Sequence, residues 1–255
     1  MINQFLHREP VAVDREQHRQ LKVTLPVTDW SVASRLNAIF VALVEFRDAC
    51  REFPIVFIRT NADGEPAQVA PVAVLGVLQQ QNLYLEGGQW KATYLPAVLQ
   101  TYPFCVGRLD ADRFAICLDR SWPGLSVDVG APLFTEAGEP SEVLKSAQEQ
   151  LERLETEVQR TRLGCDALLR LDILRDMRFD ATLPDGRSIG VDGFLIVDEE
   201  RLAALSDEQV LDLHRRGLLG LIHAHLTSVG HMQKLVAWHV KREAANGVTA
   251  ANGAA

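Results

Sequence analysis

Histidines are the residues of this chain whose clustering first suggests chemistry. The stretch LHRRGLLGLIHAHLTSVGHMQKL, residues 213–235, holds four of the seven histidines: His214, His223, His225 and His231. An imidazole can act as a general acid or base near neutral pH, and it is a common ligand of transition metals. The four histidines can form one catalytic or metal-binding site only if their spacing brings the rings together.

Helical spacing separates these histidines. His223 and His225 lie about 200° apart around a helix, so they cannot bind one metal ion from the same face. His231 is two turns further along, and His214 approaches His225 only if the chain folds back at Gly217. We therefore expect a structural role for this stretch, with no metal and no cofactor. General acid–base catalysis or metal ligation by His214, His223 or His225 is the alternative.

Other patterns that carry catalysis are missing from the sequence. It contains no GxGxxG or GxxxxGK[ST] loop for a nucleotide and no GxSxG elbow for a hydrolase serine. The four cysteines form no CxxC pair, which favours free thiols in a reducing compartment. The consecutive carboxylates Asp198, Glu199 and Glu200 fit the start of a helix, where negative charge is favourable.

Three aromatic residues that each stand next to a proline are candidates for lining a ligand pocket. They are Phe53, Tyr102 and Trp122. Pockets for small molecules are commonly lined by aromatic rings, but buried rings more often serve the core. We expect core packing and keep a ligand pocket as the alternative.

Composition restricts the class of protein. The chain has 255 residues, of which 47% are hydrophobic and 24% charged, as in an ordinary soluble globular protein. A net charge of −8 without a Lys/Arg cluster argues against a nucleic-acid partner. No secretory signal is visible, and the apolar stretches are shorter than the roughly 20 residues of a membrane helix. We expect a cytoplasmic protein that contacts no membrane.

The first half of the chain predicts helices that end at prolines. Residues 25–53 read as a helix capped by Asp29 or Ser31. Strands are expected at residues 54–58 and 70–77, then around a Gly-Gly turn, and after Tyr102-Pro103. Pro96 fits the first turn of a short helix before the last of these. The repeated order of helix, aromatic residue, proline and strand indicates either an internal duplication or two independent uses of proline.

The second half predicts a long helix over residues 141–174. Its apolar seam alternates steps of three and four: Leu144, Ala147, Leu151, Leu154, Val158, Thr161, Cys165 and Leu168. The seam packs either on the domain's own sheet or in a homodimer, and we expect a homodimer to which this helix contributes. Two strands around a Pro-Asp-Gly turn follow.

The C-terminal part predicts a pair of helices. Ser206 and Gln209 have capping-box spacing, Gly217 ends the first helix, and the second runs to about Val240. The fold class is therefore mixed α+β, with antiparallel-rich sheet elements, a long central helix and a C-terminal helix pair. We expect one domain over 1–240, with a possible division into 20–135 and 141–240, and a disordered tail at 241–255.

Five blocks of the sequence resemble the SapC family of bacterial proteins. They are LNAIFVALVEFRDACREFPIVFI, YLPAVLQTYPF, ERLETEVQRTRLGCDALLRLDIL, LPDGRSIGVDGFLIVDEERLAAL and LDLHRRGLLGLIHAHLTSVGHMQKL. The resemblance extends from about Leu21 to Lys234 and transfers no catalytic residue. It implies a gene context of tryptophan-halogenase-like enzymes, cupin-like proteins and TonB-dependent receptors.

The resemblance and the missing catalytic motifs together favour a cytoplasmic accessory or small-ligand-binding protein of an uptake or modification locus. A small molecule and a protein from the same locus are the expected partners. One alternative is an enzyme that uses the C-terminal histidines. Another is a structural or interaction protein that dimerises through the long helix.

Overall fold

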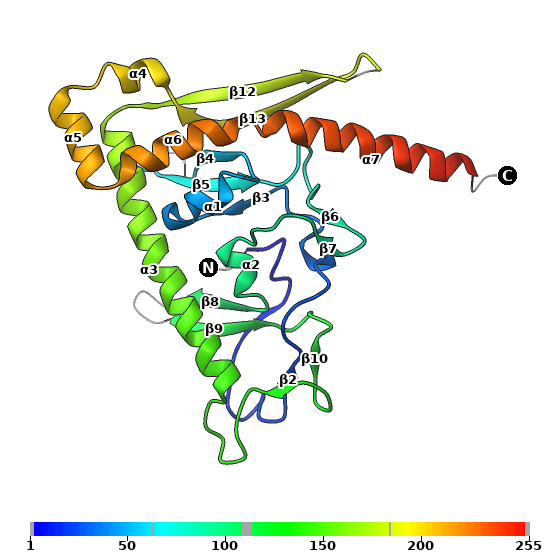
Figure 1. Cartoon of the computed structure of the whole chain (residues 1–255). Helices are drawn as coiled ribbons and strands as arrows, with labels where there is room; N and C mark the ends of the chain where they lie inside the picture. Colours follow the sequence, from blue (N-terminus) through cyan, green and yellow to red (C-terminus); the bar gives the residue numbers. More distant parts are fainter. Residues whose placement is uncertain (1–2, 63, 109–113, 184, 253–255) are drawn as a thin grey trace. The chain divides into compact units, whose positions relative to one another are not determined.

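The computed structural model describes residues 3–62, 64–108, 114–183 and 185–252 (Figure 1). For Arg108 and residues 246–252 it describes the backbone only. It contains helices and antiparallel sheets, which confirms the predicted α+β class. Two compact units make up the chain. The first comprises residues 1–35, 85–91 and 97–158, and the second comprises residues 36–84, 92–96 and 159–255. Because their segments alternate along the chain, the units do not follow the division at residues 135–141.

The first unit is built from short antiparallel strands. One sheet has the order β1-β9-β8, another the order β10-β2-β11, and β6 and β7 form a hairpin. The bounds are β1 Pro10–Ala12, β2 Lys22–Val23, β6 Leu85–Glu86, β7 Gln89–Trp90, β8 Phe104–Arg108, β9 Phe114–Asp119, β10 Leu125–Ser126 and β11 Ala131–Pro132. Two short helices, η1 Ser31–Ala33 and α2 Ala97–Gln100, also belong to this unit.

Local turn chemistry in the first unit agrees with the sequence. Gly87 and Gly88 both have positive φ, of 55° and 80°, as the tight turn between β6 and β7 requires. Helix α2 begins directly after Pro96, and β8 begins directly after Pro103. The Gly-Gly hairpin, the short helix and the strand that follows it are therefore confirmed.

The second unit holds a five-stranded antiparallel sheet of order β12-β13-β4-β5-β3. Its strands are β3 Ala38–Phe40, β4 Ile55–Arg59, β5 Val69–Val74, β12 Leu174–Thr182 and β13 Ser188–Val197. Its helices are η2 Leu43–Glu45, α1 Phe46–Ala49, α4 Glu199–Ala203, α5 Asp207–Arg215, α6 Leu218–Val229 and α7 Met232–Asn252. Helix α6 packs on β4, β13 and α1 (Figure 1).

The helix predicted over residues 25–53 is wrong. This segment contains η1, strand β3, η2 and only one α-helical turn, α1. Its centre, AIFVALV, is continuously apolar, and a short run of this kind fits a buried strand as well as a helix. Pairing with β5 decides between them, because Ile39 lies opposite Ala73 and both are buried in the sheet.

The predicted long helix is confirmed as α3 Glu142–Arg170, which passes from the first unit into the second. It ends four residues early because β12 begins at Leu174. All of its seam residues are buried within the chain, apart from the half-buried Val158. Packing inside one chain thus accounts for the burial of the seam, and a homodimer to which this helix contributes stays a prediction.

The C-terminal elements confirm the predicted caps. Asp198 accepts hydrogen bonds from the N–H groups of Glu200 and Arg201 at the start of α4, and Ser206 forms a capping box with Gln209. Gly217, with φ 72°, separates α5 from α6.

The expected last helix is divided in two, because α6 ends at Val229 and α7 begins at Met232. Helix α7 continues to Asn252 through most of the segment predicted as a disordered tail, and residues 253–255 lie outside the described residues. The alanines of this segment favour a helix, which the prediction overlooked.

Candidate functional site

His225 is the histidine that the fold uses most directly. It is fully buried on α6, with Nδ1 2.8 Å from the carbonyl oxygen of Ile55 and Nε2 3.0 Å from the backbone nitrogen of Val197. Because Nε2 accepts the Val197 N–H, the proton lies on Nδ1 and is donated to Ile55. Both ring nitrogens are therefore used in joining α6 to β4 and β13.

The burial of His225 has a consequence for acid stability. Burial lowers the pKa of His225 to about 4, with partial opposition from the Ile55 hydrogen bond. The ring is neutral in the folded protein, whereas in an unfolded chain it takes up a proton below pH ~6.5. The stability that depends on the neutral ring is therefore present above pH ~6.5 and is lost as the pH falls towards 4.

Replacing His225 with alanine is expected to lower the free energy of unfolding by about 3 kcal/mol at pH 7, because the Ile55 carbonyl and the Val197 N–H lose their partner. Urea unfolding measures this change. The variant should also lose less stability than the wild type between pH 6.5 and pH 4. His223→Ala on the exposed face of α6 is the matched control, and equal effects of the two variants would contradict this role.

The other histidines do not join His225. His214 and His223 are exposed, on α5 and α6 respectively. The Nε2 atom of His231 lies 3.1 Å from the carbonyl oxygen of Cys50. Across the described residues, no three or more His, Cys, Asp or Glu side chains are grouped so that they could hold a metal ion. Among the described residues His214 also lines an open cavity, and the histidine-enzyme alternative stays a hypothesis.

The three aromatic residues that we considered for a pocket belong to two different units. Tyr102 and Trp122 meet in the first unit, with ring centroids 6.0 Å apart. Phe53 packs in the second unit against Tyr84, with ring centroids 4.6 Å apart. All three candidate rings are buried, so their place in the structure is in the core.

A buried carboxylate, which the sequence analysis missed, organises the first unit. Asp119 ends β9 and accepts hydrogen bonds from the N–H groups of Arg8, Glu9 and Ser121 and from the hydroxyls of Ser121 and Tyr102. Burial raises the pKa of Asp119, but the hydrogen bonds together hold it below its ordinary value. The Asp-x-Ser turn at the strand end was the only available signal.

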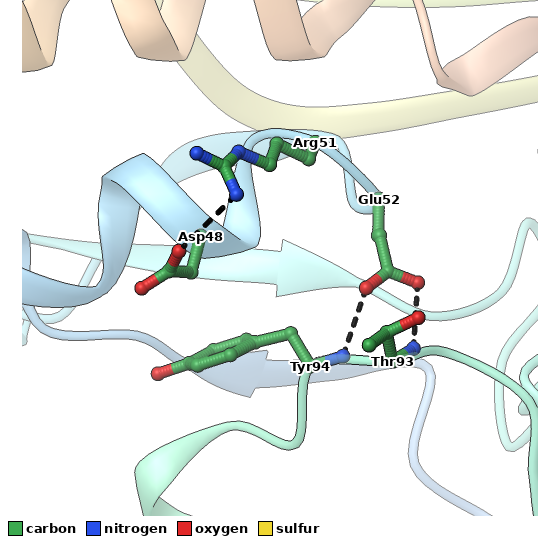
Figure 2. Close-up of a pocket in the computed structure, with 5 residues that line it drawn as sticks. All are labelled: Asp48, Arg51, Glu52, Thr93 and Tyr94. Atoms are coloured by element: carbon green, nitrogen blue, oxygen red, sulfur yellow. Dashed lines mark hydrogen bonds and ion pairs between the residues drawn. The ribbon is translucent and has the colours of Figure 1, made fainter.

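An open cavity of the second unit lies beside the end of α1. It has a volume of about 490 Å³ and is lined by Asp48, Arg51, Glu52, Thr93 and Tyr94 (Figure 2). Helix α1 and the turn after it supply the first three residues, and the segment 92–96 supplies the other two. The sequence did not indicate that these two segments meet, because residues 25–53 were expected to form a single helix.

Two glutamates fix one wall of the cavity. The Glu52 carboxylate accepts hydrogen bonds from the N–H groups of Thr93 and Tyr94, at 2.9 and 2.8 Å (Figure 2). The Tyr94 hydroxyl donates to the buried carboxylate of Glu45 at 2.8 Å. Burial, reinforced by Glu45, raises the pKa of Tyr94, so this hydroxyl stays protonated and the wall is held at both ends.

The turn after α1 is also held from helix α7. The Glu52 carbonyl oxygen accepts hydrogen bonds from the Tyr84 hydroxyl, at 2.6 Å, and from the Lys234 ammonium. Lys234 lies 5.4 Å from the ring centroid of Tyr84 and 5.0 Å from that of Trp238. Burial lowers the pKa of Lys234, and the negative charge of Glu52 offsets this effect only in part. The backbone of this turn is therefore preorganised.

The charged groups of the cavity face solvent. The Asp48 carboxylate and the Arg51 guanidinium lie 3.7 Å apart, with their side chains 59% and 75% exposed (Figure 2). An exposed ion pair of this kind contributes about 0–1 kcal/mol, so a ligand can replace it at little cost. Together these groups offer a bidentate donor for an anion and an acceptor for an ammonium or hydroxyl group.

The fold is α+β, and charged and polar residues line this cavity of its second unit. The chain belongs to the SapC family, whose family model matches residues 13–235, as the resemblance predicted. No curated protein and no solved structure matches the chain. In the part of the chain that the structure describes, no helix combines the length and the apolar character needed to cross a bilayer.

Proposed function

We propose that this chain is a small-ligand-binding accessory protein and that the cavity beside α1 is its binding site. The observation that carries the proposal is a cavity of about 490 Å³ whose wall is held by Glu52 and Glu45 while Asp48 and Arg51 stay exposed. Most ligand sites are largely preformed and have volumes of about 300–1,000 Å³. A rigid wall reduces the ordering that binding requires.

The lining residues indicate the chemistry of the ligand. Arg51 suits a carboxylate, Asp48 suits an amino or hydroxyl group, and the ring of Tyr94 offers an apolar surface. A free amino acid carries all three features. Sugar acids share the first two and are the next class to examine.

The resemblance to the SapC family implies a cellular context for this activity. We place the protein in the cytoplasm, within an uptake or modification locus that also encodes tryptophan-halogenase-like enzymes, and expect a protein partner from that locus. Indole compounds therefore belong in the ligand panel beside amino acids and sugars.

Ligand binding is expected to raise the melting temperature. At a concentration of about one hundred times Kd, a ligand stabilises a protein by about 2.7 kcal/mol. In a chain of this size that corresponds to roughly 5–10 °C. Arg51→Ala should abolish the shift, and Arg47→Ala, which removes an exposed arginine of α1 outside the cavity, should retain it.

Thermal-shift measurements with amino acids, sugars and indoles test this proposal. Calorimetry on any compound that shifts the melting temperature then separates specific binding from a solvent effect. The proposal fails if no compound class shifts the melting temperature. It also fails if Arg51→Ala binds the compound as tightly as Arg47→Ala does.

A further inference from the structure

Two cysteines of the first unit face each other across adjacent strands. Cys105 on β8 is the direct antiparallel partner of Cys117 on β9. Directly opposed residues of an antiparallel pair project from the same face of the sheet. Both thiols are free, and their exposed fractions are 1% and 6%. The register therefore places the two cysteines opposite each other in a shielded position.

The backbone spacing of this pair is compatible with a bond between the thiols. The Asp119 N–H donates to the Pro103 carbonyl at 3.0 Å, which makes Pro103 and Asp119 a hydrogen-bonded pair. Such pairs recur every second residue, so Cys105 and Cys117 belong to the same class, whose Cα atoms are about 5.5 Å apart. A disulfide joins Cα atoms that are roughly 4.4–6.8 Å apart.

The neighbouring Gly107 makes the two thiols chemically different. A methyl group at Gly107 would clash with the Sγ atom of Cys117, so the missing side chain gives this sulfur its place. Burial raises the pKa of Cys117, but a hydrogen bond from the Gly107 N–H lowers it in part. Burial raises the pKa of Cys105 to about 12, with a further contribution from Cys117. Cys117 is thus the thiol that ionises more readily and is more exposed.

We propose that Cys105 and Cys117 form a peroxide-sensitive modification site that closes to a reversible cross-strand disulfide. Hydrogen peroxide, a small uncharged oxidant, reaches a site that larger disulfide reagents do not. The Cys117 thiolate attacks one peroxide oxygen, the O–O bond breaks, and the hydroxide that leaves takes up the thiol proton as water. This step leaves Cys117 as a sulfenic acid.

The second step joins the strands. The sulfur of Cys105 attacks the sulfenic sulfur, its proton goes to the departing hydroxyl group, and the second water leaves as the S–S bond forms. Overall, two thiols and one hydrogen peroxide give one disulfide and two waters. The sulfurs lose two electrons, and the peroxide oxygens gain them.

The strand geometry makes this disulfide easy to reduce. Opposed Cβ atoms in an antiparallel pair are about 4.5–5.5 Å apart, whereas a disulfide holds them at roughly 3.5–4.5 Å. Closure therefore strains the pair, and strained disulfides are the labile ones. We expect millimolar 2-mercaptoethanol, a small uncharged thiol, to restore both thiols.

The test uses the full chain treated with millimolar hydrogen peroxide and digested without reductant. Mass spectrometry should find the Cys105 and Cys117 peptides joined, two hydrogens lighter than their sum, in most molecules. The double variant Cys50→Ser, Cys165→Ser retains the pair and should form the same link, which returns to thiols with 2-mercaptoethanol. In that background Cys105→Ser should stop at a sulfenic acid on Cys117, which dimedone traps.

Several results would overturn the proposal. One such result is that Cys105 and Cys117 both remain thiols while Cys50, which is half-buried in the second unit, is oxidised. Others are sulfinic acids in place of the linked peptide, or a disulfide that forms only between molecules. If Cys105→Ser fails to fold, the peptide map of the Cys50→Ser, Cys165→Ser variant still tests whether the disulfide forms. That variant leaves the sequences of β8 and β9 unchanged.

Discussion

Replacing Leu151 with glutamate is expected to lower the free energy of unfolding by about 4 kcal/mol or more. Leu151 lies in the seam of α3 and is 2% exposed. The substitution removes a buried apolar side chain, which alone costs roughly 2–5 kcal/mol, and places a carboxylate among apolar groups. Leu163→Glu is the matched control on the same helix, because Leu163 is 64% exposed and should change the stability by less than about 0.5 kcal/mol.

Urea unfolding followed by circular dichroism, with light scattering on the same samples, distinguishes two roles of the seam. If it belongs to the core of one chain, Leu151→Glu unfolds at much lower urea and Leu163→Glu resembles the wild type. If the wild type is a dimer and Leu151→Glu is a stable folded monomer, the seam is an intermolecular surface and the burial argument is wrong. The homodimer to which this helix contributes stays a prediction, and the wild-type mass tests it.

Replacing Asp119 with alanine is expected to cost about 4 kcal/mol. Its carboxylate receives five hydrogen bonds, three of them from backbone N–H groups. Each buried donor left without a partner costs about 1–3 kcal/mol, and water entering the space recovers part of this. The loss should also detach residues 8 and 9, because Asp119 is the acceptor for both of their N–H groups.

Thermal and urea unfolding, with hydrogen exchange of residues 8–12, measure both effects. Ser121→Ala, which removes one hydroxyl donor to the same carboxylate, is the graded control and should cost about 1 kcal/mol. Because the pKa of Asp119 is lowered in the folded state, its contribution is present above the unfolded pKa of about 3.9 and is lost as the pH falls through the folded value. An Asp119→Ala protein as stable as Ser121→Ala would contradict this assignment.

The sequence by itself determined those elements whose signals are local. Turn glycines, helix caps and long apolar periodicity depend on neighbours within a few residues, so the Gly87–Gly88 hairpin, α3 and the Ser206 capping box could be predicted. The same local reasoning separated His223 from His225 around one helix, and the structure leaves His223 exposed while it buries His225. Family membership was equally visible, because it rests on blocks of residues along the chain.

Only the tertiary structure decided what depends on partners far away in the sequence. The run AIFVALV is apolar enough for a helix or a strand. Pairing with β5 makes its first three residues, Ala38–Phe40, the strand β3. His225 is tied to β4 and β13 by backbone groups that no spacing rule could identify. The cavity brings Asp48 and Arg51 to Thr93 and Tyr94. Burial and hydrogen bonding across the fold, rather than residue type, determined which of the polar groups face solvent and can meet a ligand.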